Sequence, residues 1–93
     1  MANRPATKRR VPPRKGPKPQ NRSEYIRLTE ALVAWRHGKG LRQADLAVLI
    51  GKKQSFVTKY ETRKRRLDFL EVVAILDALG VEIDKAARFA SSR

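Results

Sequence analysis

Cysteine is absent from the 93-residue chain, which excludes disulfide bonds and thiolate metal sites and suits a reducing compartment. Long apolar runs are missing as well. The longest, VVAIL at residues 72–76, is far shorter than the roughly 20 residues that a membrane-spanning helix needs. With one Trp, two Tyr and three Phe, the chain can form one small core, which a second subunit would help to stabilise. We therefore expect a soluble, single-domain protein without a membrane partner.

Groups that carry catalysis are equally scarce. His37 is the single histidine, a GxxxxGK(S/T) phosphate-binding loop is missing, and the carboxylates are dispersed along the chain. A histidine next to Gly38 is typical of an exposed helix end. Catalytic and metal sites need several such groups close together. The sequence therefore predicts a protein that is not an enzyme and that binds no metal or cofactor.

Acidic residues are also few, since 9 Asp and Glu oppose 22 Lys and Arg for a net charge of +13. Residues 1–22 hold eight of the cations and no acid, and subtracting 8 from 13 leaves +5 for residues 23–93. A cationic surface concentrates polyanions and speeds their capture, which favours nucleic acid as the partner. The alternative is that the charge serves only solubility.

The first 22 residues differ in composition from the rest of the chain. All five prolines lie within residues 1–19, among the cations and very few apolar side chains. Such a segment cannot bury enough surface to order itself, and its prolines prevent the amphipathic helix of a transit peptide. We predict a disordered basic arm over residues 1–22, which adds sequence-independent affinity for phosphates, and a folded domain over residues 23–93.

Helical periodicity dominates the predicted domain, and no alternating β pattern competes with it. The first helix ends at Gly38 or Gly40 and has an apolar stripe with spacing i, i+3, i+7 and i+10: Tyr25, Leu28, Leu32 and Trp35. A short second helix turns four residues inward: Leu46, Ala47, Leu49 and Ile50. Val57 and Tyr60 mark a third helix, and a last turn or two follows over residues 84–90. The fold class is therefore all-α, with four or five short helices.

A fourth helix is predicted between the capping box Asp68–Glu71 and Gly80. Its expected core stripe comprises Phe69, Val72, Val73, Leu76 and Leu79. Three more apolar residues lie off this stripe: Leu67, Leu70 and Ile75. A helix that is apolar on all sides needs a second cover. Either the last helix folds back over it through Val81, Ile83 and Phe89, or another subunit covers it.

Residues 43–61 have the spacing of a helix-turn-helix. Such a motif needs a small residue in the first helix, a residue that accepts positive φ at the turn, and apolar residues that lock the two helices together. Six residues meet these needs: Leu46, Ala47, Ile50, Gly51, Val57 and Tyr60. Over residues 25–89 the sequence resembles the Cro/repressor-type (XRE-like) helix-turn-helix family. The resemblance implies a lambda-repressor-like fold, double-stranded DNA as the partner, and the cytoplasm or nucleoid of a bacterium or phage-infected host.

The resemblance also implies roles for individual residues. Arg36 and Glu61 match the ion pair between helices 1 and 3 of the family, and Gln43 matches a residue that holds a backbone phosphate. Arg42 and Lys53 replace the usual helix-capping residues, and Arg63 replaces a glycine that often follows the recognition helix. Each lost cap costs about 1 kcal/mol of stability. Contacts of these cations with DNA phosphates would offset that loss.

With Val57 and Tyr60 turned inward, the first two turns of the third helix present four polar residues to the major groove: Gln54, Ser55, Thr58 and Lys59. The residues expected at phosphates, several of them by family likeness, are Arg42, Gln43, Lys52, Lys53, Lys64, Arg65 and Arg66. Phe56 either packs on the flank of the domain or contacts a thymine methyl group.

Three functions follow from this pattern. The first is a sequence-specific transcriptional regulator, expected to be a repressor that binds as a homodimer. The second is an antitoxin that represses its own operon and holds a toxin protein. The third is a bridging module that binds RNA or an acidic protein.

Overall fold

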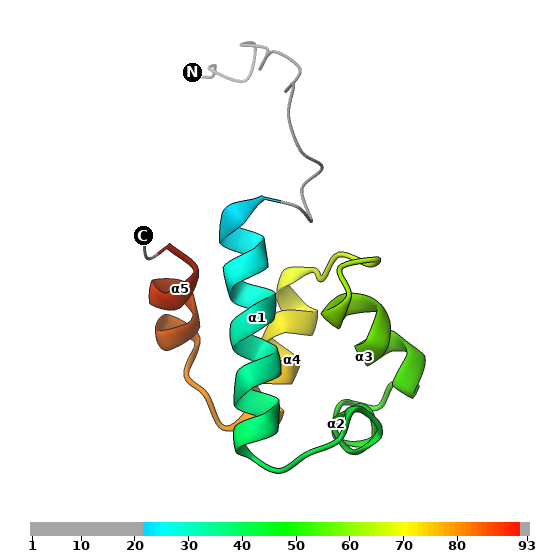
Figure 1. The fold of residues 1–93 in the computed structure, drawn as a ribbon. Coiled ribbons are helices and arrows are strands. Elements are labelled where there is room, and N and C mark those ends of the chain that lie inside the picture. The colour runs from blue at the N-terminus through cyan, green and yellow to red at the C-terminus, as the bar shows by residue number, and fades with distance from the viewer. Residues whose placement is uncertain (1–21, 92–93) are drawn as a thin grey trace, which may run out of the picture.

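The computed structural model describes residues 22–91, which form five α-helices and no strand (Figure 1). The helices are α1 (Ser23–Gly38), α2 (Gln43–Ile50), α3 (Gln54–Glu61), α4 (Phe69–Leu79) and α5 (Ile83–Ser91). This architecture confirms the predicted all-α class. Nearly all of the predicted basic arm lies outside the described residues. None of the five helices is long and apolar enough to cross a membrane.

The helix α1 packs against α3, α4 and α5 and contributes its predicted stripe to the core. Leu32 is fully buried, while Tyr25, Leu28 and Trp35 are half-buried against the same cluster. The Tyr25 hydroxyl accepts a hydrogen bond of 2.9 Å from the Leu67 backbone N–H, which joins the start of α1 to the loop before α4. Burial raises the pKa of this hydroxyl. The stripe therefore fixes α1 against both α3 and α4.

The second and third helices pack on each other through small and apolar side chains. Leu46 and Ala47 of α2 and Val57 and Tyr60 of α3 are all buried. Gly51 between the helices has φ = 70°, a left-handed conformation that glycine adopts without strain. The prediction for Leu49 is wrong, because 58% of this residue is exposed. At 100° per residue, Leu49 lies about 100° around the helix from the centre of the buried face of α2. Its side chain therefore points away from the neighbouring helices.

The helix α4 begins and ends as predicted, but its buried face differs from the expected stripe. Asp68 Oδ1 accepts a 2.8 Å bond from the Glu71 N–H, Glu71 Oε1 accepts a 3.0 Å bond from the Asp68 N–H, and Gly80 has φ = 71°. The buried residues are Leu67, Ile75, Leu76 and Leu79, with Val72 half-buried. Phe69, Leu70 and Val73 are 66%, 75% and 36% exposed. Both stripes have helical spacing, and the packing of α1 and α2 against α4 selects between them.

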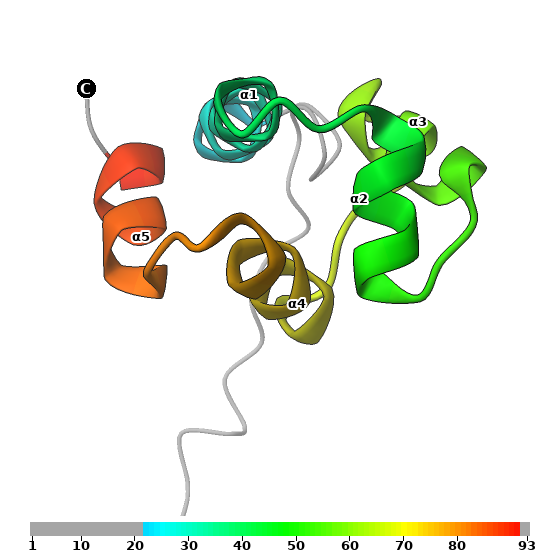
Figure 2. The ribbon, with the colours of Figure 1, turned by 90° about the horizontal axis from the view of Figure 1, so that it is seen from below.

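The helix α5 packs beside α1 and does not fold back over the exposed side of α4. Figure 2 shows α1 and α4 in the centre, with α5 on one side and α2 and α3 on the other. The rings of Trp35 and Phe89 meet edge to face, with centroids 5.5 Å apart. Arg27 Nε donates a 2.9 Å hydrogen bond to the Ala90 carbonyl. Within residues 22–91, the outer face of α4 therefore remains uncovered.

Candidate nucleic-acid interface

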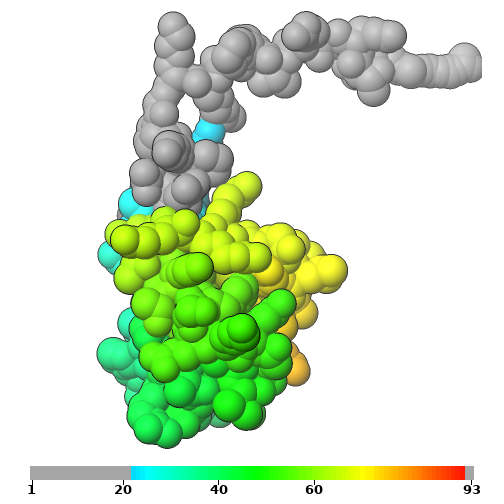
Figure 3. Space-filling view, turned by 90° about the vertical axis from the view of Figure 1, so that its right-hand side faces the viewer, coloured from blue at the N-terminus to red at the C-terminus, as the bar shows by residue number. Residues whose placement is uncertain are grey.

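The helix α3 lies at the edge of the domain, where α2, α3 and the following loop form one continuous face (Figure 3). Its inward residues Val57 and Tyr60 are fully buried. Gln54, Ser55 and Lys59 are exposed, whereas Thr58 is half-buried toward α2. The α3 backbone is therefore rotated so that its polar residues from the first two turns stand on the outer side.

Arg36 and Glu61 form a buried ion pair between α1 and α3. Arg36 Nε donates to Glu61 Oε2 at 2.7 Å and Arg36 Nη2 donates to Glu61 Oε1 at 3.0 Å. The two side chains are only 8% and 5% exposed. Arg36 Nη1 also donates to the Leu41 carbonyl at 2.8 Å. The guanidinium thus holds the end of α3 and the loop before α2 in one fixed arrangement.

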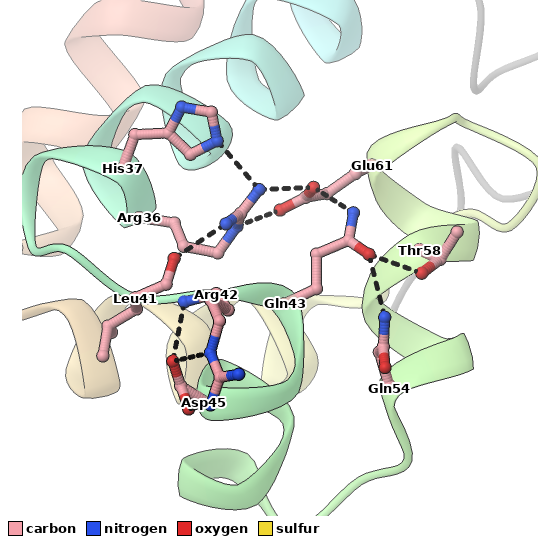
Figure 4. Close-up of polar contacts among 9 residues, drawn as sticks. All are labelled: Arg36, His37, Leu41, Arg42, Gln43, Asp45, Gln54, Thr58 and Glu61. Carbon is pink, nitrogen blue, oxygen red and sulfur yellow. Dashed lines mark hydrogen bonds and ion pairs between the residues drawn. The ribbon is translucent and has the colours of Figure 1, made fainter.

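Gln43 extends this pair into a hydrogen-bond network that reaches the outer side of α3 (Figure 4). Gln43 Nε2 donates to Glu61 Oε1 at 2.8 Å. Gln43 Oε1 accepts from the Thr58 hydroxyl at 2.7 Å and from Gln54 Nε2 at 3.4 Å. The first residue of α2 is therefore bonded to both the start and the middle of α3.

The start of α2 lacks a capping acceptor at the N-cap, Arg42, but the carboxylate of Asp45 in the first turn bonds back to that residue. Arg42 has no acceptor, but its backbone N–H donates to Asp45 Oδ2 at 2.9 Å and its Nη2 donates to Asp45 Oδ1 at 2.9 Å. These hydrogen bonds from Arg42 lower the pKa of Asp45 to about 2. The sequence reading missed Asp45, although its position three residues after the N-cap is a recognisable signal. Lys53, which precedes α3, makes no capping bond of its own.

Phe56 packs on the flank of the domain, which is one of the two predicted alternatives. Its ring is half-buried and meets Tyr60 edge to face, with centroids 5.7 Å apart. The Arg65 guanidinium lies over the outer side of the ring, 4.8 Å from its centroid. Glu71 accepts two bonds from Arg65, at 2.8 and 2.9 Å, and these lower the pKa of Glu71. Arg65 therefore joins α3 to α4, an interaction that its sequence context did not reveal.

The other predicted phosphate-contacting cations surround α3 on the surface. Lys52 and Lys53 precede the helix, while Lys64 and Arg66 follow it, and all four are exposed. Arg63 turns the chain after α3 with φ = 60°, so an arginine takes the left-handed conformation that glycine favours. In residues 22–91 no cluster of His, Asp and Glu could hold a metal ion. The surface therefore offers hydrogen-bonding groups flanked by positive charge.

The helices α2 and α3 pack on each other through small and apolar residues, and the polar side of α3 is exposed between cations. This arrangement is that of a DNA-binding helix-turn-helix domain. The chain belongs to the helix-turn-helix family HTH_3, of the XRE type, which it matches over residues 33–85. The matched segment extends from the middle of α1 to the start of α5 and covers more than half of the chain. No curated protein matches the chain. The protein is accordingly a DNA-binding regulator of the helix-turn-helix class.

Proposed function

We propose that the protein is a sequence-specific transcriptional repressor that binds a palindromic operator as a homodimer, with half-sites about one helical turn apart. The observation that carries the proposal is the exposed polar side of α3, with Gln54, Ser55 and Lys59 outward over a fully buried Val57. Gln matches the major-groove edge of adenine, and Lys matches that of guanine. The helix α3 is the recognition helix in this proposal.

The backbone contacts are assigned to the cations around α3. Lys52 and Lys53 on one side and Lys64 and Arg66 on the other are exposed. We assign them to the two strands that border the major groove. Arg42 and Gln43 at the start of α2 complete this set. Arg65 is held by Glu71, so we assign it mainly to positioning the loop. If 6 to 10 phosphates are neutralised, log K falls against log salt with a slope of roughly −5 to −9.

The test separates base readers from backbone contacts. A preferred duplex is first selected from a random pool by the full-length protein, and affinities are then compared between that duplex and random DNA. We expect Gln54→Ala and Lys59→Ala to lower the ratio of specific to random affinity. Lys64→Ala and Arg66→Ala, as matched surface variants, should weaken both duplexes equally. Equal effects of all four variants on both duplexes would refute the assignment of roles.

The basic segment of residues 1–22 has a separate place in the proposal. Its eight cations carry no opposing acid, so it adds phosphate contacts that are independent of sequence. Removing residues 1–20 should flatten the salt slope and weaken specific and random DNA by the same factor. A truncated protein with altered base preference would instead show that the segment reads sequence.

An antitoxin role is the second candidate, favoured by the uncovered face of α4. Phe69 and Leu70 are more than half exposed there, although they belong to the most apolar helix of the domain. A toxin seated on this face would bury them while α3 remained free for DNA. Co-purification of a small protein encoded by the neighbouring gene supports this role. A repressor without that partner is a homodimer in solution and binds its own upstream DNA alone.

A further inference from the structure

The outer face of α4 combines exposed apolar side chains with a carboxylate. At 100° per residue, four positions share one stripe opposite the buried side of the helix: Leu70, Val73, Ala74 and Asp77. All four are exposed, and Phe69 beside them is 66% exposed. Adjoining apolar side chains in water mark an interaction surface. The outer face of α4 is therefore suited to a docking partner.

A groove extends this face toward the ends of α2 and α3. It has a volume of about 310 Å³, and four apolar side chains and two carboxylates line it: Ile50, Phe56, Leu70, Ala74, Asp68 and Glu71. Lys52 lines it as well. Glu71 is already paired with Arg65, whereas Asp68 has no ion-pair partner within residues 22–91. The groove therefore suits an occupant that is apolar and positively charged.

The distribution of charge separates the possible occupants. Residues 67–84 contain five acids and no cation, so with +13 for the whole chain, subtracting −5 leaves +18 for all other residues. Asp77 and Glu82 in this segment are exposed and have no ion-pair partner in the part of the chain that the structure describes. Two copies that met through this face would bring like charges together, which disfavours a second copy. A cationic segment is attracted to it.

The first 20 residues of the same chain have the composition that this face requires. They contain seven cations, no acid, five prolines and Val11. Proline-rich segments bind surfaces that offer exposed aromatic side chains, as Phe69 does.

These residues also join the domain beside α4. The segment ends next to Tyr25, whose hydroxyl lies 2.9 Å from the Leu67 backbone nitrogen, so the starts of α1 and α4 lie at the same end of the domain (Figure 1). From Arg22 back to Val11 the chain can span up to about 36 Å, whereas α4 is only about 17 Å long. The segment can therefore reach every residue of the outer face.

We propose that residues 1–20 dock along the outer face of α4 in the free protein and leave it for phosphates when DNA binds. Each contact between exposed charges is weak, but a tethered segment has an effective concentration on the order of 1 mM. The docked segment covers Leu70 and Val73 and neutralises Asp77. Duplex DNA, with its denser negative charge, then competes for the same cations. The docking step is independent of the proposed function, and only the transfer to DNA rests on it.

The test uses a spin label on the full-length protein. Because the chain has no cysteine, Ala6→Cys gives a single site for a nitroxide label on the basic segment. In isotope-labelled protein without DNA, at about 50 mM salt, the label should broaden the NMR signals of the Leu70, Val73 and Asp77 amides selectively over those of α5. At about 500 mM salt most of this broadening should disappear, because exposed charges are screened.

A matched pair of charge reversals tests the docking face. Asp77→Lys changes the outer face of α4, where a cation near the helix end is compatible with folding. Glu30→Lys makes the same charge change on an exposed residue beside α5. We expect Asp77→Lys to remove most of the broadening and Glu30→Lys to retain it. Equal broadening in both variants would overturn the proposal.

Two further samples test the other occupants. In a mixture of isotope-labelled protein without the nitroxide and nitroxide-labelled protein without the isotope, only another copy can cause broadening. Broadening of the α4 amides in this mixture overturns docking within one chain. Removing residues 1–20 should shift these amides; unshifted amides would mean that the face is vacant and open to a separate protein, which also overturns the proposal.

Adding DNA separates the docking from the proposed function. With a selected duplex, the amides of α3 should shift and the broadening on α4 should disappear. Full broadening at saturating duplex would overturn the transfer of the segment to phosphates. A protein whose α3 amides respond to no duplex refutes the proposed function, whereas the docking result has been obtained without DNA.

Discussion

Breaking the Arg36–Glu61 pair should destabilise the domain more than any exposed substitution. Replacing Glu61 by Leu leaves the Arg36 side chain, which is only 8% exposed, without its carboxylate partner. Loss of one partner of a buried pair costs about 3–5 kcal/mol. Since about 70 ordered residues supply roughly 4–10 kcal/mol of stability, the variant should be largely unfolded or melt on the order of 20 °C lower.

The double variant Arg36→Met/Glu61→Leu tests the reasoning behind that number. Apolar residues of similar size remove the uncompensated charge, so we expect the double variant to unfold within about 2 kcal/mol of wild type in urea followed by circular dichroism. The exposed α5 pair, Arg88 with Asp84 at 3.2 Å, is the matched control, and Arg88→Met should change stability by less than about 1 kcal/mol. If the effects of the two single variants simply add in the double variant, the pair is not coupled and the reasoning fails.

Three further predictions concern individual residues. Arg63→Gly should raise the free energy of unfolding by about 0.5–1 kcal/mol, because it removes the backbone strain of an arginine at φ = 60°. Arg63→Ala keeps that strain and should bring no gain, and urea denaturation distinguishes the two variants. Tyr60→Phe should leave the free energy of unfolding unchanged or raise it by up to about 1 kcal/mol, because the buried Tyr60 hydroxyl has no hydrogen-bond partner in residues 22–91. Thermal melting measures the change, and a large loss of stability would mean that this hydroxyl is bonded. Asp45, whose pKa is lowered to about 2, should stabilise the start of α2 above pH 4 and lose that effect as the pH falls toward 2. An NMR titration of its carboxyl carbon follows this pKa, and a titration midpoint near pH 4 would contradict the prediction.

Local patterns in the sequence predicted those parts of the fold that depend on local chemistry. The capping box at Asp68, the left-handed glycines at positions 51 and 80, and the first-helix stripe each depend on residues within one or two turns. Each of these signals can be recognised within one segment of the chain, without knowing how the helices pack on one another. The all-α class follows from the same signals.

Contacts between distant residues explain what the sequence did not predict. The helix α4 carries two apolar stripes, and the placement of α1 and α2 against it decides that Ile75 is buried and Leu70 exposed. The bond between Arg65 and Glu71 depends on how the loop after α3 turns back onto α4. For the candidate site, the motif located the outward side of α3, but the donor and acceptor order of Gln43 became visible only from its distances to three other side chains.

The contact of Arg65 with Phe56 and Glu71 has a consequence for the kinetics of association. An arginine that is already held between a ring and a carboxylate restrains the basic loop in the free protein. Fewer rotamers then have to be ordered when the loop meets a duplex, which lowers the entropic barrier to forming the complex. The Arg65 side chain therefore does not have to be ordered again when the domain meets DNA.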